Sequence, residues 1–359
     1  MPDNHHGLNQ MSVNLTSNDV LGMAQHPALK LAMKAAVDAY GIGATGSRRL
    51  SGNHDIFCET EERVAQWVGK PSAVLFNSGY QMNSGVFSIL VQKNTLVVAD
   101  KWVHASIIDG LLRTPATVKR FRHNDAAHCE AILQKMASEF DAVIIVCESV
   151  YSMDGDTPPI HDLVRLKHAF GAMLVVDEAH AIGVFGAGGR GWLHEQGALE
   201  DVDVLLITFG KALGCCGAMA LGSHALSDTI KRRCRSYIYS TALPLPVVAV
   251  IQSSVAIVQG ADALRHQLQA NIQQFKALVH TESSTHIQPI IIGGSDDALA
   301  LQRALNRLGY DVRAVHHPTV PKGQSRLRII ISATHSTQDI QQFSAHLTTR
   351  SAPYLAHVG

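Results

Sequence analysis

Residues 204–214 read VLLITFGKALG, an apolar run that continues into a glycine and a lysine. The four apolar residues Val204–Ile207 are typical of a strand that is buried on both faces of a parallel sheet. Lys211 would lie just beyond the end of this strand, where burial favours a neutral, nucleophilic amine. Such a lysine can form a Schiff base with a carbonyl compound, including the aldehyde of pyridoxal phosphate. The alternative is a lysine that extends its ammonium group into solvent.

Residues 172–180 read AMLVVDEAH. Here too a predicted apolar strand is followed by polar side chains, because it ends in Asp177 and His180 comes three residues later. A carboxylate beside the ring nitrogen of pyridoxal keeps that nitrogen protonated, and a histidine can bond the ring hydroxyl. The spacing to Lys211 (211 − 177 = 34) leaves room for one connection and one strand. Both side chains would then lie at the carboxyl edge of a parallel sheet. A strand-end cap is the alternative for Asp177, but the two segments together favour a cofactor site.

The middle of the chain alternates apolar runs with amphipathic stretches, which predicts a mainly parallel sheet covered by helices on both faces. The apolar runs that we interpret as strands are Ala73–Phe76, Leu96–Ala99, Val143–Cys147, Met173–Val176, Val204–Ile207 and Ala218–Leu221.

A proline-punctuated segment, TALPLP at 241–246, marks a boundary after the last of these strands. Beyond it we expect a helical stretch over 247–279 and a smaller α+β region. That region has predicted strands near 287–292, 311–315 and 328–331, and predicted helices over 297–308 and 337–347. We therefore expect a short N-terminal segment (1–40), a large cofactor-binding domain (41–245) and a small C-terminal domain (246–359).

Composition excludes several classes of function. The 359 residues contain 30 basic and 30 acidic side chains, so no net charge favours nucleic acid or a membrane surface. No apolar run reaches the length of a membrane span, and the start MPDNHH lacks the pattern of a secretory signal. Six cysteines do not make a disulfide framework in a chain this long, so we expect a cytoplasmic protein. The twenty histidines form no cluster with ligand spacing, and we expect no metal.

A set of motifs along nearly the whole chain resembles the α-oxoamine synthases, a family of pyridoxal-phosphate enzymes. The motifs are LTSND at 15–19, SRRLSG at 47–52, NSGY at 77–80, HAS at 104–106, FRHND at 121–125, ESVYSMDGD at 148–156, DEAH at 177–180, TFGK at 208–211, YST at 239–241, PTVP at 318–321 and RLR at 326–328. The resemblance implies the fold-type I aminotransferase-like fold, with a mainly parallel seven-stranded-type sheet, helices on both faces and a smaller C-terminal α+β domain. It also implies a homodimer with shared active sites.

The resemblance assigns the cofactor contacts. Lys211 would hold the cofactor and act as base, Asp177 would face the ring nitrogen, His180 the ring hydroxyl, and His104 would stack on the ring. A core histidine is the alternative for His104, whose neighbours are apolar. Backbone N–H groups at a helix start hold phosphate well, which favours Ser78, Gly79 and Tyr80 as phosphate contacts, with ordinary helix capping as the other interpretation. The remaining predicted contacts are Ser152, Thr208, Ser240 and Thr241, of which the last two would reach in from the partner subunit.

Substrate contacts are predicted in the outer parts of the chain. Arg328 is the candidate for the amino-acid carboxylate, because a guanidinium binds a carboxylate bidentately. Arg326, two residues earlier on the same predicted strand, is expected to point to the other face. Asn18 belongs to the first family motif. His316 stands where the family has an arginine, and we predict that it meets an anionic part of the acyl substrate.

The resemblance is greatest to the biotin-pathway members, on RHND at 122–125, IQPI at 287–290 and PTVP. It implies decarboxylative condensation of L-alanine with pimeloyl-CoA, or its carrier-protein form, to 8-amino-7-oxononanoate. Val20, His316 with His317, and the short N-terminus depart from the pattern. They leave open glycine C-acetyltransferase or an autoinducer-type synthase.

Two interpretations from other classes are less consistent with the residues. A cofactor-binding protein without turnover is disfavoured by the presence of both Lys211 and Asp177. The match to G-x-G-x-x-G at 41–46 follows a predicted helix rather than a strand, so it is not a dinucleotide-binding fingerprint.

Overall fold

The structure is a computed structural model that describes residues 13–355, and these residues form two compact units. The large unit comprises residues 22–151 and 157–262, and the small unit comprises residues 13–21, 152–156 and 263–355. The two units are groups of residues in contact with one another, and they do not test where the expected domains begin and end. The expected boundaries at residues 40 and 245 therefore stay a prediction. The first twelve residues, on which the signal-sequence argument rests, lie outside the described part.

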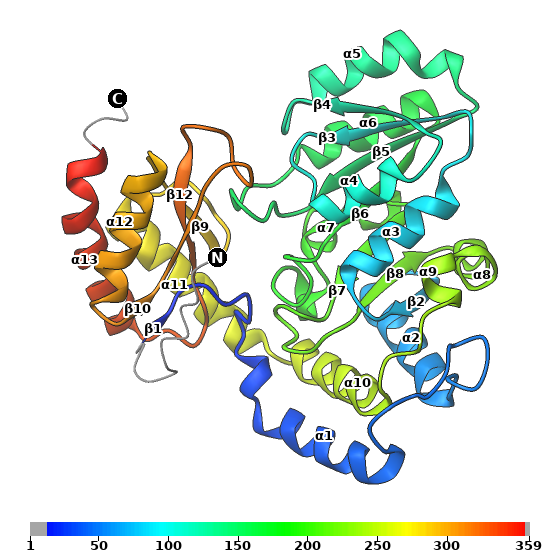
Figure 1. Cartoon of the computed structure of the whole chain (residues 1–359), viewed down its shortest axis with the longest axis horizontal. Coiled ribbons are helices and arrows are strands. Elements are labelled where there is room, and N and C mark those ends of the chain that lie inside the picture. The colour runs from blue at the N-terminus through cyan, green and yellow to red at the C-terminus, as the bar shows by residue number, and fades with distance from the viewer. Residues whose placement is uncertain (1–12, 356–359) are drawn as a thin grey trace. The chain divides into compact units, whose positions relative to one another are not determined.

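The large unit is built around a seven-stranded sheet in the order β2-β8-β7-β6-β5-β3-β4 (Figure 1). The strands are β2 Ser72–Phe76, β3 Thr95–Asp100, β4 Thr117–Phe121, β5 Ala142–Glu148, β6 Met173–Asp177, β7 Val204–Thr208 and β8 Ala218–Gly222. Only β8 runs against the others, since it pairs antiparallel with both β2 and β7. The predicted mainly parallel sheet is confirmed, and each of the six predicted strands lies within an observed one.

Strand β4 was missed because its sequence lacks an apolar run. It forms the edge of the sheet, and Lys119 and Arg120 on it are exposed. A strand with one neighbour does not need to be apolar on both faces, so periodicity alone does not reveal it.

Helices cover both faces of this sheet, as predicted (Figure 1). On one face α3 and α4 pack on alternate residues of the strands, including Val97, Val146 and Val175. Residues between these positions, such as Val98 and Val176, are also fully buried, so the central strands are apolar on both faces. The helices of the large unit are η1 Met23–Gln25, α1 Pro27–Tyr40, α2 Asp55–Val68, α3 Gly79–Leu90, α4 Ala105–Leu112, α5 Ala126–Met136, η2 Ala137–Glu139, α6 Ile160–Phe170, η3 Ala187–Gly189, α7 Trp192–Glu195, η4 Leu199–Asp201, α8 His224–Arg233, α9 Arg235–Ile238 and α10 Leu245–Gln259.

The small unit has an antiparallel three-stranded sheet in the order β11-β12-β9 and a short parallel pair, β1 with β10. Its elements are β1 Val13–Asn14, α11 Asp262–Val279, β9 Ile287–Gly293, α12 Ser295–Asn306, β10 Tyr310–Asp311, β11 Arg313–Val315, β12 Ser325–Ile330 and α13 Thr337–Leu355. The single strand predicted at 311–315 is divided between the two sheets. The single helix predicted over 247–279 is α10 and α11, which break at Gly260.

No single helix within residues 13–355 is long and apolar enough to cross a membrane. Helices α10 and α11 meet the limits of length and composition only when taken together as a bent pair.

Candidate active site

The carboxyl edge of the large sheet gathers the predicted side chains around one cavity of about 310 Å³. Asp177 ends β6, Glu148 ends the neighbouring β5 directly opposite it, and Thr208 ends β7. Lys211 follows Thr208 by three residues and lines the same cavity. The arrangement follows from parallel pairing, which places the ends of neighbouring strands side by side.

The turn that carries Lys211 is held on several sides. Within it, Gly214 N donates to Lys211 O at 2.8 Å, and Cys215 N donates to Phe209 O at 2.8 Å. The hydroxyl of Ser254, on α10, donates to Leu213 O at 2.7 Å. Gly214 has a φ of +64°, and a Cβ built there would lie 2.2 Å from the backbone nitrogen of Ala24. Only glycine fits this close approach, so the turn has little freedom to move the lysine backbone.

Asp177 is 5% exposed and its two carboxylate oxygens have separate donors. The backbone N–H of Ala179 donates to Oδ1 at 2.9 Å, and Asn83 Nδ2 donates to Oδ2 at 3.2 Å. Asn83 Nδ2 also bonds the hydroxyl of Ser106 at 2.9 Å. These bonds fix the orientation of a buried carboxylate in the wall of the cavity.

Helix α3 begins at the cavity with Ser78 as its N-cap, whose hydroxyl accepts from the backbone N–H of Gln81 at 3.2 Å. Gly79 approaches the end of β7 so closely that a Cβ would lie 2.9 Å from Thr208 Cγ2. The buried Oγ1 of Thr208 has no hydrogen-bond partner within the described chain. A helix start beside an unsatisfied hydroxyl can accept an anion such as a phosphate.

His104 and Glu148 occupy another wall of the cavity. The backbone N–H of His104 donates to Glu148 Oε1, and His104 Nδ1 lies 2.7 Å from Ser106 Oγ. Burial lowers the pKa of His104, which favours the neutral imidazole. Burial, reinforced by the negative charge of Asp177, raises the pKa of Glu148 well above its ordinary value. The buried Glu148 carboxyl therefore keeps its proton more readily than an exposed one, and it lies directly beside Asp177.

Six more of the predicted residues differ in their relation to this cavity. Tyr80 and His180 line it, and the Tyr80 hydroxyl donates to Asp109, which raises the pKa of Tyr80. Ser240 and Thr241 do not line it, although Gln81 Nε2 donates to Ser240 Oγ at 2.7 Å and Asn77 Nδ2 donates to Thr241 O at 2.8 Å. Both therefore connect to the start of α3. Ser152 and Arg328 lie in the small unit.

Within the small unit Arg328 is half-buried and makes two hydrogen bonds. Its Nε donates to Ser152 O at 2.5 Å, and its Nη2 donates to Asn18 Oδ1 at 3.0 Å. No acidic side chain of residues 13–355 forms an ion pair with it. Burial lowers its pKa to about 10, so it is still charged at neutral pH. A half-buried cation without an acid partner is suited to binding an anion.

The expected orientation of Arg326 was wrong. Residues i and i+2 of a strand share a face, and Arg326 and Arg328 both reach the segment 152–154. Arg326 is paired with Asp154, which neutralises it, whereas Arg328 has no such acid. His316 follows β11 and is exposed, and Val20 is buried in the small unit.

The cavity is also lined by eight residues that were not among the predicted contacts: Asn77, Asn83, Ser106, Glu148, Ala179, Gly210, Cys216 and Gly217. Asn83 lies one turn after Gly79 on α3. A polar residue on an otherwise apolar helix face could have identified it as a site residue from the sequence. Within residues 13–355 there is no cluster of three or more His, Cys, Asp or Glu side chains suited to a metal.

Comparisons with known proteins agree with this geometry. A family model described as "Aminotransferase class I and II" matches residues 10–347. A protein of Bacillus cereus (strain G9842), provisionally named 8-amino-7-oxononanoate synthase, is 40% identical over 336 residues, which cover 92% of this chain and 85% of the relative.

Solved structures with the same fold include two kinds of enzyme. Serine palmitoyltransferase from S. paucimobilis, with bound PLP, superposes with a TM-score of 0.92 at 30% identity, covering 96% of this chain and 88% of the other. Serine palmitoyltransferase of Sphingomonas wittichii gives 0.91 at 31% identity, over 96% and 88% of the two chains. The 8-amino-7-oxononanoate synthase of Francisella tularensis gives 0.79 at 26% identity, over 94% and 97%.

Proposed function

We propose a specific reaction for this chain, which belongs to the class I and II aminotransferase family and, within it, to the α-oxoamine synthase group. It is a pyridoxal-phosphate-dependent acyltransferase that joins an amino acid to an acyl thioester with loss of carbon dioxide. The proposed substrates are L-alanine and pimeloyl-CoA, or the pimeloyl carrier protein. The product would be 8-amino-7-oxononanoate, a precursor in biotin synthesis.

The observation that carries this proposal is Lys211 in one cavity with Asp177, at the ends of neighbouring strands. The choice of alanine and a pimeloyl thioester rests on relatives at 40% identity that are named as 8-amino-7-oxononanoate synthases.

The cavity has groups suited to each part of pyridoxal 5'-phosphate. The Lys211 amine would hold its aldehyde carbon, and Asp177 would hold the proton on its ring nitrogen. The start of α3, from Ser78 to Tyr80, and the unsatisfied Thr208 hydroxyl would hold its phosphate. His104 and His180 are the candidates for the ring face and the ring hydroxyl. Ser152, Ser240 and Thr241 stay predicted contacts, the last two from a partner subunit.

When bound, the cofactor supplies an electron sink for negative charge that develops on the amino-acid Cα. Lys211 takes the proton from alanine Cα as general base. A C–C bond then forms between this Cα and the acyl carbonyl carbon, and the C–S bond breaks with its electron pair on sulfur, so that a thiolate leaves and takes a proton from water. The bond from Cα to the carboxylate breaks next and releases carbon dioxide. Lys211 returns a proton to Cα.

The other residues position these groups. Asn83 and the N–H of Ala179 keep the Asp177 carboxylate fixed, so its charge stays aimed into the cavity. Arg328 would bind the alanine carboxylate through its unpaired charge until decarboxylation, and Asn18 orients its guanidinium. Neutral His104 would stack and pass protons, since its lowered pKa leaves a nitrogen lone pair available.

We also propose a homodimer whose two active sites share residues. The support is the family resemblance and exposed apolar side chains on and after α1, such as Leu31, Ile42 and Leu50. Such side chains on a surface are typical of a protein–protein interface.

A second candidate is the condensation of serine with a long-chain acyl thioester. The serine palmitoyltransferases favour it, because they superpose with higher TM-scores and higher identity than the Francisella synthase does. Glycine C-acetyltransferase and an autoinducer-type synthase remain further predictions in the same group.

One assay separates these reactions. The protein reconstituted with pyridoxal phosphate is incubated with alanine, serine or glycine and with acetyl-, pimeloyl-, octanoyl- or palmitoyl-CoA, and products are measured by mass spectrometry. We expect 8-amino-7-oxononanoate from alanine and pimeloyl-CoA at the highest kcat/KM. A higher kcat/KM for serine with palmitoyl-CoA would replace our proposal by the second candidate.

A further inference from the structure

A second cavity, of about 520 Å³, adjoins the active-site cavity within the large unit. Apolar side chains of α1 and α10 form two of its walls, among them Leu29, Met33 and Val247. Its third wall is the turn 214–216, which follows Lys211. Cys216 lines both cavities, so the two meet at this residue. We refer to the second cavity as the α1–α10 groove.

The walls of the α1–α10 groove are held in place by contacts described above. Ser254 of α10 bonds the lysine turn, and Gly214 of the turn packs against the backbone just before α1. Leu29 is 4% exposed and Val250 is 7% exposed, so both belong to the packed core beneath the groove. A groove with such walls is preformed, and an occupant would lie against the turn that carries Lys211.

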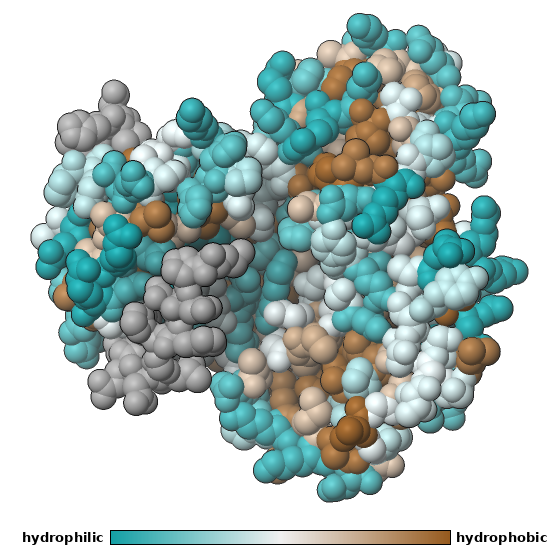
Figure 2. Space-filling model, in the orientation of Figure 1, coloured by the Kyte–Doolittle hydropathy of each residue, from teal (hydrophilic) through white to brown (hydrophobic). Residues whose placement is uncertain are grey.

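The charged side chains of the groove are two lysines of α1, Lys30 and Lys34. They are four residues apart, which separates them by about 6 Å along the helix and places them on one side of it. Both are exposed, and neither forms an ion pair with an acid in the described part of the chain. Figure 2 shows apolar surface in the region of α10, bordered by hydrophilic side chains along α1.

We propose that the α1–α10 groove binds the acyl chain of the thioester, and that Lys30 and Lys34 hold a carboxylate at the far end of that chain. The inference rests on the proposed function, which requires an acyl carbonyl beside Lys211. An aliphatic chain fits the apolar walls, because burying its methylene groups is favourable. A terminal carboxylate then compensates the two positive charges. The groove thus selects acyl thioesters of dicarboxylic acids over those of simple fatty acids.

Coenzyme A offers another anion, since its phosphates could pair with the same lysines. The groove favours the chain carboxylate, because one cavity combines mainly aliphatic walls with the two cations and the turn that follows Lys211. A second copy of the chain could also cover the α1–α10 groove, and the experiment below tests for it.

The experiment compares two thioesters of equal chain length on the holoenzyme. Pimeloyl-CoA has the terminal carboxylate, and heptanoyl-CoA lacks it. Dissociation constants are measured by titration calorimetry for wild type, for Lys30→Gln/Lys34→Gln, and for Lys93→Gln. Lys93 is an exposed lysine that lines neither cavity, and it controls for the change in net charge.

The double variant should bind pimeloyl-CoA about three- to ten-fold more weakly, as expected for the loss of two exposed ion pairs. Its affinity for heptanoyl-CoA should stay within about two-fold, and the Lys93→Gln control should match wild type for both ligands. Met33→Trp, which fills the groove, should weaken both thioesters and leave the KM for alanine unchanged.

Equal weakening of both thioesters by the double variant would overturn the proposal and assign the lysines to the coenzyme A phosphates. Unchanged binding in the double variant and in Met33→Trp would overturn it as well. Loss of binding together with dissociation into monomers, measured by sedimentation, would show that a second copy covers the groove. Because binding is measured without turnover, failure to form product would overturn only the proposed reaction.

Discussion

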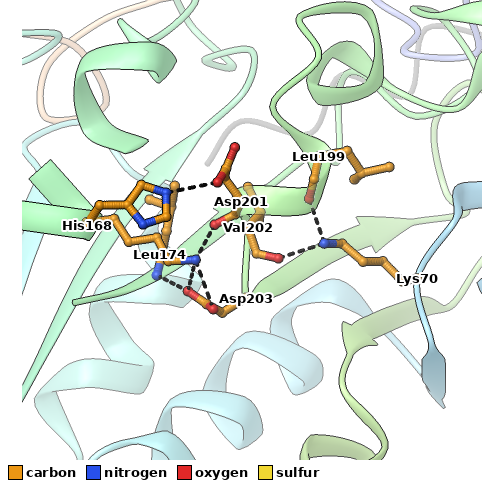
Figure 3. A network of polar contacts seen from close by, with 8 residues as sticks. Lys70, His168, Leu174, Leu199, Asp201, Val202 and Asp203 are labelled. Carbon is orange, nitrogen blue, oxygen red and sulfur yellow. Dashed lines mark hydrogen bonds and ion pairs between the residues drawn. The ribbon is translucent and has the colours of Figure 1, made fainter. Parts of the chain in front are cut away.

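The two edges of the large sheet both carry buried polar groups, but they differ in how these groups are satisfied. At the amino edge, just before β6 and β7, the charged side chains bond one another and the backbone (Figure 3). At the carboxyl edge, Glu148 and Asp177 lie side by side, and the Thr208 hydroxyl has no partner within the described residues.

The amino edge is a closed network. Lys70 Nζ donates to the carbonyls of Leu199 at 2.6 Å and Val202 at 2.7 Å. Asp203 accepts from the backbone N–H of Leu174 at 2.7 Å and from Lys167 at 3.0 Å. Figure 3 shows these groups converging on the segment that joins η4 to β7.

The difference separates stability from function. Groups that satisfy one another stabilise the chain and leave little capacity for a ligand. Groups held in a cavity beside another acidic group, or with unused hydrogen-bonding capacity, cost stability, and that cost is accepted where a ligand completes them. We therefore expect substitutions at the carboxyl edge to lower turnover more than stability. Substitutions at the amino edge should lower stability more than turnover.

Lys211→Ala should have the largest effect. Without the amine, borohydride should no longer fix the cofactor to the protein, and turnover should fall to background. The melting temperature of the cofactor-free protein should change little. The attached cofactor is located by mass spectrometry of peptides after reduction. Labelling of a different lysine in wild type would show that the assignment is wrong.

Asp177→Asn should keep the cofactor bound but lower kcat by several orders of magnitude. An amide has no charge with which to hold the proton on the ring nitrogen. Cofactor content is measured by absorbance after gel filtration, and kcat by product formation. A rate close to that of wild type would remove Asp177 from the chemistry and make it resemble the amino-edge residues.

Glu178→Gln tests a carboxyl-edge residue that we assign to stability. Its Oε1 accepts from Leu193 N at 2.7 Å, and burial raises its pKa from 4.5 to about 8. Between these values the unfolded chain loses a proton that the folded chain keeps, so stability falls as pH rises, by up to about 1.4 kcal/mol per pH unit. Denaturant titrations of wild type and Glu178→Gln from pH 4.5 to 8 should show this slope only in wild type. Parallel curves would contradict it.

Lys70→Met should lower the free energy of unfolding by about 1–3 kcal/mol, because two buried carbonyls lose their donor. The kcat and both KM values should stay within about two-fold, since the network does not reach the cavity. Lys135→Met, at the exposed end of α5, is the control for a lost lysine charge. A specific loss of kcat in Lys70→Met would break the distinction between the edges.

His316→Arg should have the smallest effect, and it concerns a residue outside both edges. Histidine loses its charge near neutrality, whereas arginine keeps it. If His316 meets an anionic part of the acyl substrate, the wild-type KM for acyl-CoA should rise with pH, and the variant should flatten that rise. A charge-assisted contact corresponds to roughly a ten-fold difference in KM. Superimposable pH profiles from about one unit below to about two units above the ordinary histidine pKa would leave His316 a packing role.

Much of the fold was predictable because the apolar runs of the central strands are continuous. Val204–Ile207 and Val143–Cys147 are buried on both faces, and runs of this length are typical of strands but too short for a typical buried helix. The edge strand β4 and the division of 311–315 between two sheets were not predictable, since both depend on neighbours distant in sequence.

The site followed the same rule. Lys211, Asp177 and His104 are placed by the strands that precede them, so motif and topology together located them. Asn83 and Ser106 act through bonds to Asp177 that cross between elements, and no local pattern reports such bonds. Arg326 failed for a simpler reason, because the two-residue period of a strand was applied with the wrong parity.

The reversed strand β8 has a consequence for synthesis of the chain. It lies between β2 and β7, so β2 cannot pair within the sheet until residues 218–222 have been made. On the ribosome both β2 and β7 would present unpaired apolar edges during most of translation of the large unit, and such edges promote aggregation. A chain released before residue 218 would retain both edges, and expression of fragments that end on either side of β8 should therefore differ sharply in solubility.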